Sequence, residues 1–474
     1  MSTTTTPVTA TPSWLPARAP ITSGAEYVES LRGRGLKVHF MGKMIAEPVD
    51  HPLIRPPINA VARTYDLANE DPALASAVIG ASGQRVNRFL HVTESVADVV
   101  AQNKMQRRLG QLTGTCFQRC VGMDAINALY PVTWSIDQAR GTRYHARLRA
   151  FIAGMQAHNL VIGGAMTDPK GDRSKGPSEQ DDPDMFVRVV ARRDGGVVIR
   201  GAKAHQTGCI NSHWIVVMPT MRLGPADRDY AIVCAVPVDH PGLRFVVGRQ
   251  SCDTRAMEGG SVDQGNAGFS GQEALILIDD VFVPEYRTHR AIDGFLCQNP
   301  GQAANDGPLY TLPWAQVFVR SVSTAAFGGA QAAINAGLAI MQDRVSTNTG
   351  KASKQDPMLQ AALARAIAEK SEMETTLRLT FDELMGYAER GEAIPMQKRA
   401  FFAYQSSNVV RRLADLIDGI VQLLGGRAIY MTSEIIQPWL DLNAGRAHVA
   451  NDPNNRAADV VGTWLGEQPA FTFL

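Results

Sequence analysis

Two cysteines four residues apart are the first feature of this chain that could do chemistry. Cys116 and Cys120 would share one face if the stretch between them is helical. Thiolates bind zinc or iron–sulfur clusters, but such a centre needs about four ligands. The sequence has no Cys and no His from residue 298 to residue 447, which limits where further ligands could come from. Two buried thiols that pack as small apolar groups are the commoner alternative.

A charged segment, Thr167-Asp168-Pro169-Lys170-Gly171-Asp172-Arg173, combines acids and bases with a proline and a glycine. Its backbone N–H groups, together with Lys170 or Arg173, could bind a phosphate or the edge of a flavin ring. An exposed turn has the same composition, and composition alone favours the turn.

Residues 201–213 follow a predicted strand and carry many side chains that donate or accept hydrogen bonds. Glycine and alanine alternate there with polar residues, which lets a planar polar ligand approach the backbone closely. A sheet edge that faces solvent tolerates the same residues, and the two interpretations are equally supported. The polar candidates are Lys203, His205, Gln206, Thr207 and Asn211.

Glu273 precedes an apolar run that ends near residue 283. It is either a surface charge at the start of a strand or a buried general base with a raised pKa, and the sequence favours the surface. The chain contains neither a G-x-S-x-G motif nor a P-loop, and no G-x-G-x-x-G motif follows a strand. Hydrolase and dinucleotide-binding Rossmann folds therefore have no support.

The elements that must position these residues begin with helices. Residues 22–155 have a mostly helical pattern, which starts at a capping box formed by Ser23, or Thr22 before it, with Glu26. Further helices are expected over residues 96–112 and 144–158.

Turn residues mark where the helical period stops. Prolines in the segment 50–57 cannot continue a helix, which predicts a loop. From about residue 160 the period becomes that of strands, and Asp194-Gly195-Gly196 joins the runs 186–192 and 197–203 into a predicted hairpin. Further strands are expected over residues 214–218, 230–238, 243–247 and 273–283.

The helical period returns after about residue 310. Asp356-Pro357 supplies an N-cap and a proline in the first turn, and an apolar stripe over 413–424 ends at Gly425-Gly426. The order of helices, then strands, then helices along the chain predicts an α+β protein with an acyl-CoA-dehydrogenase-like architecture. The expected parts are a disordered lead-in (1–20), an N-terminal helical domain (21–158), a flavin-binding antiparallel β-barrel domain (159–290) and a C-terminal helical bundle (291–474).

Charge and hydropathy exclude several classes of function. Lys and Arg number 47 against 46 Asp and Glu, a net charge of +1, so no basic field would attract nucleic acid or an acidic membrane. We find no apolar run long enough to span a bilayer, and residues 1–19 lack the pattern of a secretory signal. Six cysteines in a chain of 474 residues do not form a secreted disulfide framework, which predicts free thiols and a cytoplasmic protein.

Several long, irregular motifs occur in order within the first 290 residues. They include the segments 104–111, 116–124, 164–173 and 201–213. In these motifs the chain resembles the 4-hydroxyphenylacetate 3-hydroxylase family of flavoproteins, and within it the branch of the 4-hydroxybutyryl-CoA dehydratases. The resemblance implies FAD bound across the β domain, usually in a homotetramer.

The resemblance also assigns roles to individual residues. Gln118, Thr207 and Glu273 match residues that line the dehydratase site, with Glu273 as the candidate base, and Arg119 matches an arginine that holds the phenol in the hydroxylases. The catalytic candidates are thus Gln118, Arg119 and Glu273. The loop 167–173 and the strand 203–211 would bind the flavin through Thr167, Asp168, Lys170, Asp172, Arg173, Lys203, His205, Gln206, Thr207 and Asn211.

One departure from the family pattern concerns the cluster. In the dehydratases three cysteines and one histidine hold a four-iron cluster, and Cys116 and Cys120 match two of these ligands. The region of the other two ligands contains only residues such as Trp314, Val319, Ser321 and Ala326. Because two thiolates do not hold a cluster, we expect FAD with no iron–sulfur cluster and no other metal.

A second departure concerns the substrate. The hydroxylases hold their phenol with an Arg, a Tyr and a His, but Met123 and Gly164 stand at the Tyr and His positions here. A phenol would lose two polar partners, so an ordinary phenol is not the expected substrate.

The hypothesis that the sequence favours is a two-component monooxygenase. It would accept FADH2 from a separate flavin reductase and oxidise a small organic substrate, which CoA or a carrier protein could carry. The first alternative is a cluster-free, flavin-dependent 4-hydroxyacyl-CoA dehydratase or isomerase with Glu273 as base. The second alternative is a non-catalytic flavin-binding subunit, because the chain lacks both the two remaining cluster ligands and the phenol-binding Tyr and His.

Overall fold

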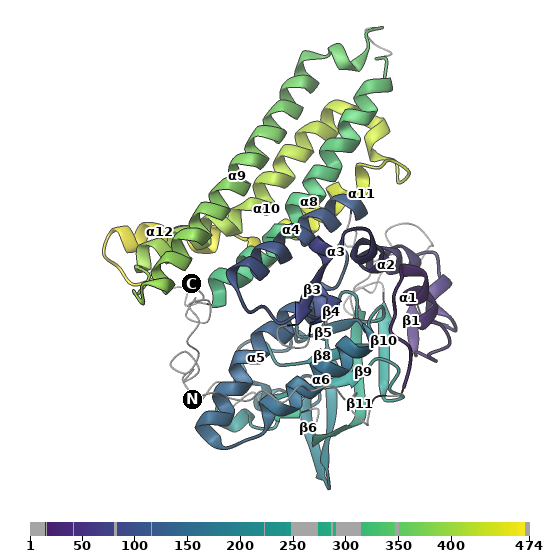
Figure 1. Ribbon diagram of the computed structural model, residues 1–474, viewed down its shortest axis with the longest axis vertical. Helices are drawn as coiled ribbons and strands as arrows, with labels where there is room; N and C mark the ends of the chain where they lie inside the picture. Colours follow the sequence, from purple (N-terminus) through teal and green to yellow (C-terminus); the bar gives the residue numbers. More distant parts are fainter. Residues whose placement is uncertain are drawn as a thin grey trace. The chain divides into compact units, whose positions relative to one another are not determined.

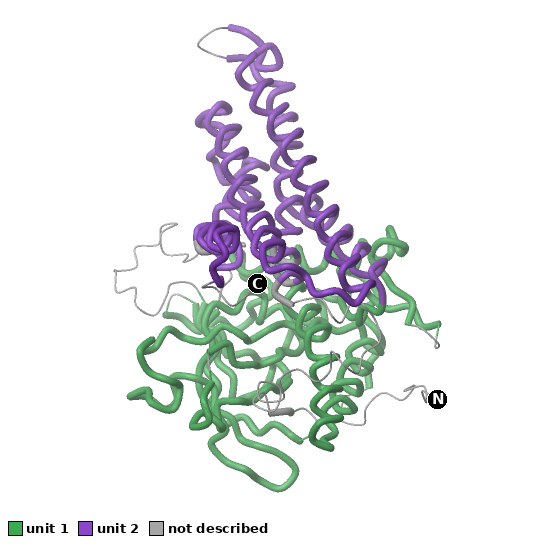
Figure 2. The backbone as a smooth tube through the Cα atoms, turned by 90° about the vertical axis from the view of Figure 1, so that its left-hand side faces the viewer, with its two compact units in different colours: residues 1–94, 117–266, 271–305 green, residues 95–116, 267–270, 306–474 purple. Residues whose placement is uncertain are grey.

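The computed structural model describes residues 15, 17–40, 42–79, 83–114, 116–221, 223–247, 274–285, 288–290, 314–346 and 350–469. The chain divides into two compact units, which are described separately here (Figure 2). Unit 1 comprises residues 1–94, 117–266 and 271–305, and unit 2 comprises residues 95–116, 267–270 and 306–474. The four domains expected from the sequence stay a prediction, because compactness alone does not fix a domain boundary.

Unit 1 contains helices at two of the positions predicted from the sequence. Helix α1 (Gly24–Ser30) starts after Ser23, whose hydroxyl accepts a hydrogen bond from the Glu26 backbone N–H, and this confirms the predicted N-cap. Helix α6 (Tyr144–His158) has the predicted bounds. The other α-helices described in this unit are α2 (Arg55–Glu70), α3 (Pro72–Ala75) and α5 (Cys120–Arg140).

The loop predicted over residues 50–57 is shorter than expected. Helix α2 begins at Arg55, so Pro56 and Pro57 occupy its first turn. Proline is tolerated there because the first N–H groups of a helix have no partner within the helix. The prediction is wrong at these residues because it treats prolines that start a helix as prolines that break one.

The strands of unit 1 form two main sheets (Figure 1). The first has the order β2-β1-β10-β11-β7-β6 and the second the order β12-β9-β8-β5. The strands are β1 (Val38–Phe40), β2 (Lys43–Ile45), β5 (Ile162–Ala165), β6 (Arg188–Arg193), β7 (Gly196–Lys203), β8 (Trp214–Val217), β9 (Ile232–Pro237), β10 (Leu243–Val247), β11 (Ala274–Pro284) and β12 (Thr288–Arg290), while β3 (Ser76–Ile79) pairs with β4 (Gln84–Asn87) in a small separate sheet.

The predicted hairpin is confirmed. Strands β6 and β7 pair antiparallel, with Arg193 opposite Gly196 and a turn at Asp194-Gly195. Gly195 has φ +76°, a left-handed conformation that glycine adopts without a steric penalty. The hairpin brings Lys203, the last residue of β7, into the first sheet beside Ile276 of β11.

The sheets correct the expectation of an antiparallel β-barrel. Strand β1 pairs with β10 in parallel, and β5 pairs with β8 in parallel, so neither sheet is purely antiparallel. The described strands do not close into a barrel, so that part of the expectation is unconfirmed. The sequence could not show this, because a strand near residue 40 that adds to one near residue 245 leaves no local signal.

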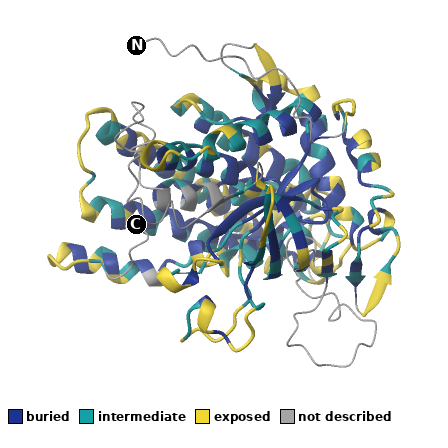
Figure 3. Ribbon diagram, turned by 90° about the horizontal axis from the view of Figure 1, so that it is seen from below, coloured by how far each residue is buried: buried dark blue, intermediate teal, exposed yellow. Residues whose placement is uncertain are grey.

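The core of unit 1 lies on the strands and on the helices that cover them. Ile215 of β8, Phe245 of β10 and Ile276 of β11 are fully buried. Figure 3 shows the strands as mostly buried and the connecting segments as largely exposed. Helices α5 and α6 lie against the second sheet (Figure 1), so the sheet is covered where β5 ends.

Unit 2 is helical, as the periodicity predicts. Asp356 caps α9 by accepting hydrogen bonds from the backbone N–H groups of Met358 and Leu359, which confirms the predicted N-cap. Gly425, with φ +67°, ends α10 as expected. The α-helices described here are α4 (Val96–Thr113), α8 (Trp314–Asp343), α9 (Pro357–Glu389), α10 (Met396–Leu424), α11 (Ile436–Arg446) and α12 (Asn454–Trp464).

Glycines set the closest helix contact of unit 2. Helix α4 crosses α8 where Gly110 meets Gly328, and a Cβ at Gly328 would lie 2.2 Å from the carbonyl oxygen of Arg107. The Arg107 side chain donates to Thr324 Oγ1 and lies 5.0 Å from the ring centroid of Phe327. The two backbones can approach this closely only because glycine has no side chain.

Among the described residues, none of the helices has the length and apolar character needed to cross a bilayer.

Candidate functional site

A buried polar cluster in unit 1 contains two of the predicted site residues, Gln118 and Asn211. The Asn211 side-chain amide donates to Gln118 Oε1 over 2.6 Å, and the backbone carbonyl of Asn211 accepts a hydrogen bond from the Tyr27 hydroxyl. Gln118 has φ +54°, and Gly208, at φ +76°, packs directly against it. The carboxamide oxygen of Gln118 is therefore held by Asn211, which fixes how this side chain is turned.

Arg119 lies beside this cluster as a buried cation. Its side chain is 2% exposed, and Nη1 donates to Thr64 Oγ1 over 2.8 Å. The guanidinium lies 4.9 Å from the ring centroids of both Tyr65 and Phe89. Within the described part of the chain, Nη2 has no hydrogen-bond partner and no carboxylate pairs with Arg119. Such a group can bind an anion or a carbonyl oxygen, because burial without a partner is costly for a charge.

Aromatic rings complete the surroundings of Arg119. Tyr27 and Tyr65 stack with their ring centroids 5.2 Å apart, and both side chains are buried. Burial raises the pKa of Tyr65 to about 12, while the nearby Arg119 charge opposes this shift. Burial also lowers the pKa of Arg119. Both tyrosines are therefore neutral at physiological pH and can act only as hydrogen-bonding and ring-stacking groups.

Close packing of α5 on β5 removes space at one expected substrate position. A Cβ at Gly122 would lie 2.0 Å from the carbonyl oxygen of Ile162, and a Cβ at Gly164 would lie 2.1 Å from Val121 Cγ1. A histidine at position 164 would require at least the Val121 side chain to move. Met123, at the other position discussed for a phenol, is 1% exposed. Positions 123 and 164 therefore both lie in closely packed surroundings.

A second group of predicted residues meets where β5 and β7 end. Lys203 forms an ion pair with Asp168, and both side chains are almost fully buried. Gln206 accepts a hydrogen bond from the Met166 backbone N–H and donates to the Thr167 carbonyl. The structure therefore brings Asp168 together with Lys203, which is 35 residues away in the sequence, and with the nearby Gln206.

The remaining predicted flavin ligands lie at the surface of unit 1. Asp172 accepts hydrogen bonds from the backbone and side chain of Ser174, and these bonds lower the pKa of Asp172. This local turn supports the expectation of an exposed turn over part of the segment 167–173. The exposed residues are Thr167, Lys170, Asp172, Arg173 and His205, and Thr207 is half-buried.

Glu273, the predicted base, lies outside the described residues. Its neighbour Ala274 starts β11, and the Ala274 carbonyl accepts a hydrogen bond from the Gln206 backbone N–H over 2.9 Å. The described end of β11 is therefore adjacent to the Lys203–Gln206 segment.

The two cysteines do not share a helix face. Helix α4 ends at Thr113 and α5 begins at Cys120, so Cys116 lies between helices, where its backbone N–H donates to Asp441 Oδ2 in unit 2. Among the described residues, no three His, Cys, Asp or Glu side chains gather closely enough to hold a metal ion. The expectation of no iron–sulfur cluster stays a prediction, because residues 248–273 and 291–313 lie outside the described part of the chain.

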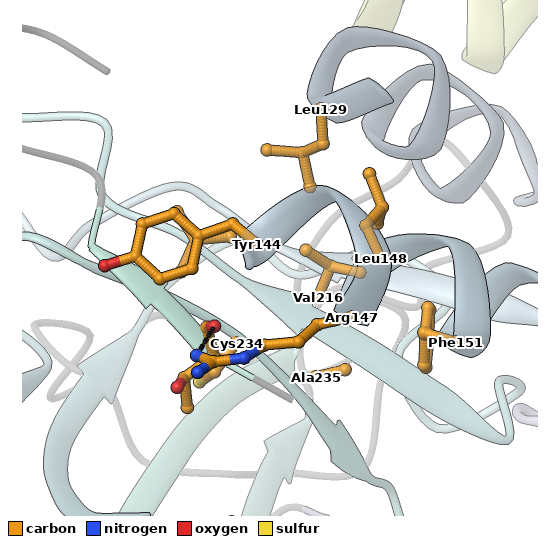
Figure 4. A pocket seen from close by; sticks show the side chains of 10 residues that line it. Leu129, Tyr144, Arg147, Leu148, Phe151, Val216, Cys234 and Ala235 are labelled. Atoms are coloured by element: carbon orange, nitrogen blue, oxygen red, sulfur yellow. Dashed lines mark hydrogen bonds between the residues drawn. The ribbon is translucent and has the colours of Figure 1, made fainter. Parts of the chain in front are cut away.

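Unit 1 also contains a small apolar cavity of about 40 Å³ between α5, α6 and the second sheet (Figure 4). Phe151 and Val216 line it, and Arg147 lies at its edge, where the guanidinium pairs with Glu285. A cavity of this size has room for a few water molecules but not for an acyl chain with a thioester. We therefore place the candidate site at the polar groups around Gln118 and Lys203 instead.

Sequence reasoning missed several residues of the site. Tyr27, Thr64 and Phe89 surround the Gln118–Arg119 segment, but no motif distinguishes them from ordinary core residues. The only signal is the polar character of Thr64 on the otherwise apolar face of α2, and it is weak. These contacts depend on tertiary packing of α1 and α2, which lie far from residue 118 in the sequence.

Two family models match the chain. Residues 23–288 match the model described as 4-hydroxyphenylacetate 3-hydroxylase, N terminal, and residues 321–453 match acyl-CoA dehydrogenase, C-terminal domain. The second match agrees with the predicted acyl-CoA-dehydrogenase-like architecture.

Two curated proteins illustrate the sequence similarity. The chain is 50% identical over 277 residues to 4-hydroxybutyryl-CoA dehydratase/vinylacetyl-CoA-Δ-isomerase of Clostridium aminobutyricum, covering 58% of this chain and 55% of that protein. It is 26% identical over 324 residues to the oxygenase component of 4-hydroxyphenylacetate 3-monooxygenase of Thermus thermophilus, covering 67% and 64%. The chain thus spans between half and two thirds of the length of these relatives.

Solved structures resemble the chain over more of its length. An oxygen-tolerant archaeal 4-hydroxybutyryl-CoA dehydratase from N. maritimus matches with a TM-score of 0.71 and 38% identity, over 93% of this chain and 92% of that one. The oxygenase component of 4-hydroxyphenylacetate 3-monooxygenase in complex with FAD matches with a TM-score of 0.57 and 18% identity, over 96% and 93%. The latter similarity shows the fold alone.

These comparisons overturn the monooxygenase hypothesis. The relative at 50% identity and the structure with a TM-score of 0.71 are both dehydratases, whereas the two oxygenases described above are 18% and 26% identical. Gly164 also lies in a crowded part of the structure, where a Cβ would come within 2.1 Å of Val121 Cγ1. The relatives are enzymes, and the oxygenases among them bind FAD.

Proposed function

Because the chain belongs to the 4-hydroxyphenylacetate 3-hydroxylase family, we propose that it is a flavin-dependent dehydratase or double-bond isomerase of 4-hydroxyacyl-CoA thioesters. The observation that carries this proposal is the 50% identity to 4-hydroxybutyryl-CoA dehydratase/vinylacetyl-CoA-Δ-isomerase. The matched structure from N. maritimus supports it over almost the whole chain. The proposed substrates are accordingly 4-hydroxybutyryl-CoA and vinylacetyl-CoA.

The residues around β5 and β7 suit a flavin. Lys170 and Arg173 are exposed cations that can meet a pyrophosphate, and Thr167 and Thr207 offer hydroxyls for a polar ring edge. The buried side chains beneath them hold the backbone in place without competing for the ligand. When bound, FAD would supply reversible electron transfer next to the substrate.

The buried polar cluster suits the thioester. Among the residues that the structure describes, Arg119 has an unpartnered N–H and no carboxylate partner, so it can donate to a carbonyl oxygen and stabilise negative charge that develops there. Gln118 is fixed by Asn211 and can orient the same group. Glu273 remains the proposed base that takes a proton from the acyl chain.

We further propose that this protein works without an iron–sulfur cluster. Isomerisation of vinylacetyl-CoA removes a proton from C2 and returns a proton at C4, so no group leaves and no Lewis acid is required. Dehydration of 4-hydroxybutyryl-CoA also removes water, and the leaving hydroxyl then needs a proton donor. Because Cys116 and Cys120 match only two of the four cluster ligands of the dehydratases, the isomerase reaction is the one that the residues support most directly.

The test is turnover of both thioesters by the purified protein under nitrogen with FAD. We expect conversion of vinylacetyl-CoA to the conjugated enoyl-CoA, followed by absorbance and chromatography, with less than one equivalent of iron or acid-labile sulfide per four chains. Full activity that depends on stoichiometric iron and sulfide would refute the cluster-free part. Binding of FAD with no turnover of either thioester would refute the proposal that these thioesters are the substrates.

A further inference from the structure

The ion pair between Lys203 and Asp168 ties strand ends and loops together from inside the protein. Lys203 is the last residue of β7, and Asp168 follows β5 by three residues. The two side chains are 1% and 4% exposed. Lys203 Nζ also donates to the carbonyl oxygens of Met166 and Met218 over 3.0 and 2.7 Å. The three protons of the ammonium group therefore have three acceptors within the protein.

The second oxygen of Asp168 holds another loop. Asp168 Oδ2 accepts hydrogen bonds from the backbone N–H of Thr220 at 2.8 Å and from the Thr220 hydroxyl at 3.0 Å. The Met221 backbone N–H donates to the same oxygen over 3.2 Å. Asp168 thus connects the segment after β5 to the segment after β8, and Lys203 joins both to β7.

These contacts leave the pair unsuited to direct ligand binding. The ammonium group has its acceptors, both carboxylate oxygens are occupied, and neither side chain reaches the surface. In contrast, Thr167 and Thr220 are exposed on the two loops that the pair holds. Ligand contacts from this region would therefore come from the loops rather than from the pair.

We propose that Lys203 and Asp168 are positioning residues, which shape the segments 166–168 and 218–221 into the surface that receives the flavin and do not touch the flavin themselves. This inference rests on the proposed function. It differs from the expectation that both side chains bind the cofactor directly. Gln206 supports the same segment from its other side, through Met166 and Thr167.

If Lys203 and Asp168 only stabilised the fold, substitutions would change melting temperature and FAD affinity together, so the variants must separate these two quantities. Asp168→Asn keeps the size of the side chain but replaces one acceptor oxygen with a donor, so it breaks the bonds to one of the two loops. Lys203→Met keeps the length of the side chain but removes every donor. Because removing one charge leaves the other buried and unpaired, the double variant is needed to separate lost positioning from lost stability.

The chain offers a matched control in the same unit. Lys175 and Asp181 also form a Lys–Asp ion pair, but their side chains are 35% and 94% exposed. Lys175→Met and Asp181→Asn make the same chemical changes where the pair holds no second loop.

The experiment measures the apoprotein and the FAD complex of each variant. Hydrogen exchange of the apoprotein should become faster in the segments 166–168 and 218–221 for Asp168→Asn and for the double variant, while the control variants match the wild type. The FAD dissociation constant, from fluorescence quenching, should rise at least about tenfold with a shifted flavin absorption band. The double variant should recover melting temperature over the single variants without recovering FAD affinity.

Four outcomes would overturn the proposal. If the double variant recovers both stability and FAD affinity, the pair has only a structural role. If Lys203→Arg, which cannot meet the same three acceptors, keeps wild-type FAD affinity, positive charge rather than loop shape matters. Failure of the wild type to bind FAD refutes the proposed function as well, whereas normal wild-type binding with unaffected variants refutes this inference alone.

Discussion

Asn211 donates its side-chain N–H to Gln118 Oε1 across 93 residues of sequence, and this bond fixes the carboxamide of a residue in a left-handed backbone conformation. Both side chains are buried, so water does not compete for the bond. The consequence is a Gln118 side chain that is oriented before any substrate arrives, which lowers the cost of binding a transition state.

Replacing Asn211 with leucine tests this orientation. Asn211→Leu keeps the volume but removes the donor, so the Gln118 carboxamide loses the hydrogen bond that orients its oxygen. We expect turnover of vinylacetyl-CoA to fall on the order of a hundredfold, with FAD affinity within about twofold of wild type. Asn69→Leu is the control, because Asn69 is an exposed residue that donates only to the Thr22 carbonyl. Equal turnover in the two variants would contradict the role of Asn211.

For Arg119 we predict opposite effects on protein stability and on affinity for the CoA thioester. Arg119→Met removes a buried charge that has no carboxylate partner, so the melting temperature should stay the same or rise. Affinity for a CoA thioester should fall by at least about tenfold, because the donor to the carbonyl oxygen is lost. Calorimetry measures both effects, and FAD should remain bound. A large loss of stability with unchanged thioester affinity would make Arg119 a structural residue, whereas loss of FAD would mean that the pocket is misplaced.

Local signals in the sequence predicted the local structure well. The N-caps at Ser23 and Asp356, the hairpin around Gly195 and the bounds of α6 all depend on residues within a few positions of one another. Pro56 and Pro57 show the limit of such signals, because the same residue type breaks a helix in its interior and starts one in its first turn.

Pairings between distant segments could not be predicted from the sequence. The parallel pairing of β1 with β10 depends on residues about two hundred positions apart. The candidate site depends on such pairings too. The resemblance predicts Lys203 and Asp168 as separate flavin ligands, and only the structure shows that they form a buried ion pair. Side-chain direction at a strand end depends on register, which a slip of one residue would reverse.

Two adjacent glycines of α8 provide a stability test with an internal control. A Cβ at Gly328 would lie 2.2 Å from a backbone oxygen of α4, whereas a Cβ at Gly329 would meet no atom within 4 Å. Gly328→Ala should therefore lower the free energy of unfolding by about 1–3 kcal/mol through overpacking. Gly329→Ala should raise it by about 0.5–1 kcal/mol, because alanine favours the helix. Urea denaturation measures both, and similar values for the two variants would contradict the close crossing.

The buried side chain of His213 leads us to expect that acid destabilises unit 1. Its Nδ1 accepts a hydrogen bond from the Val161 backbone N–H, and its Nε2 lies 2.9 Å from the Ser30 hydroxyl. Burial, followed by the charges of Arg34, Arg18 and Arg119, holds the pKa of His213 well below its ordinary value of 6.5. At a pH near 6.5 His213 therefore binds a proton in the unfolded chain but not in the folded protein. The free energy of unfolding falls as the pH drops below about 6.5.

The size of this effect is measurable against a variant that does not titrate. His213 should contribute a slope approaching 1.4 kcal/mol per pH unit below pH 6, down to the pKa of the folded state. His213→Asn keeps an acceptor for the Val161 N–H but has no group that titrates in this range. Urea denaturation at pH 7.5 and pH 5 should show that the wild type loses more stability than the variant, and the difference cancels the contributions of the other histidines. Parallel pH profiles for the two proteins would show that His213 takes up a proton in the folded state.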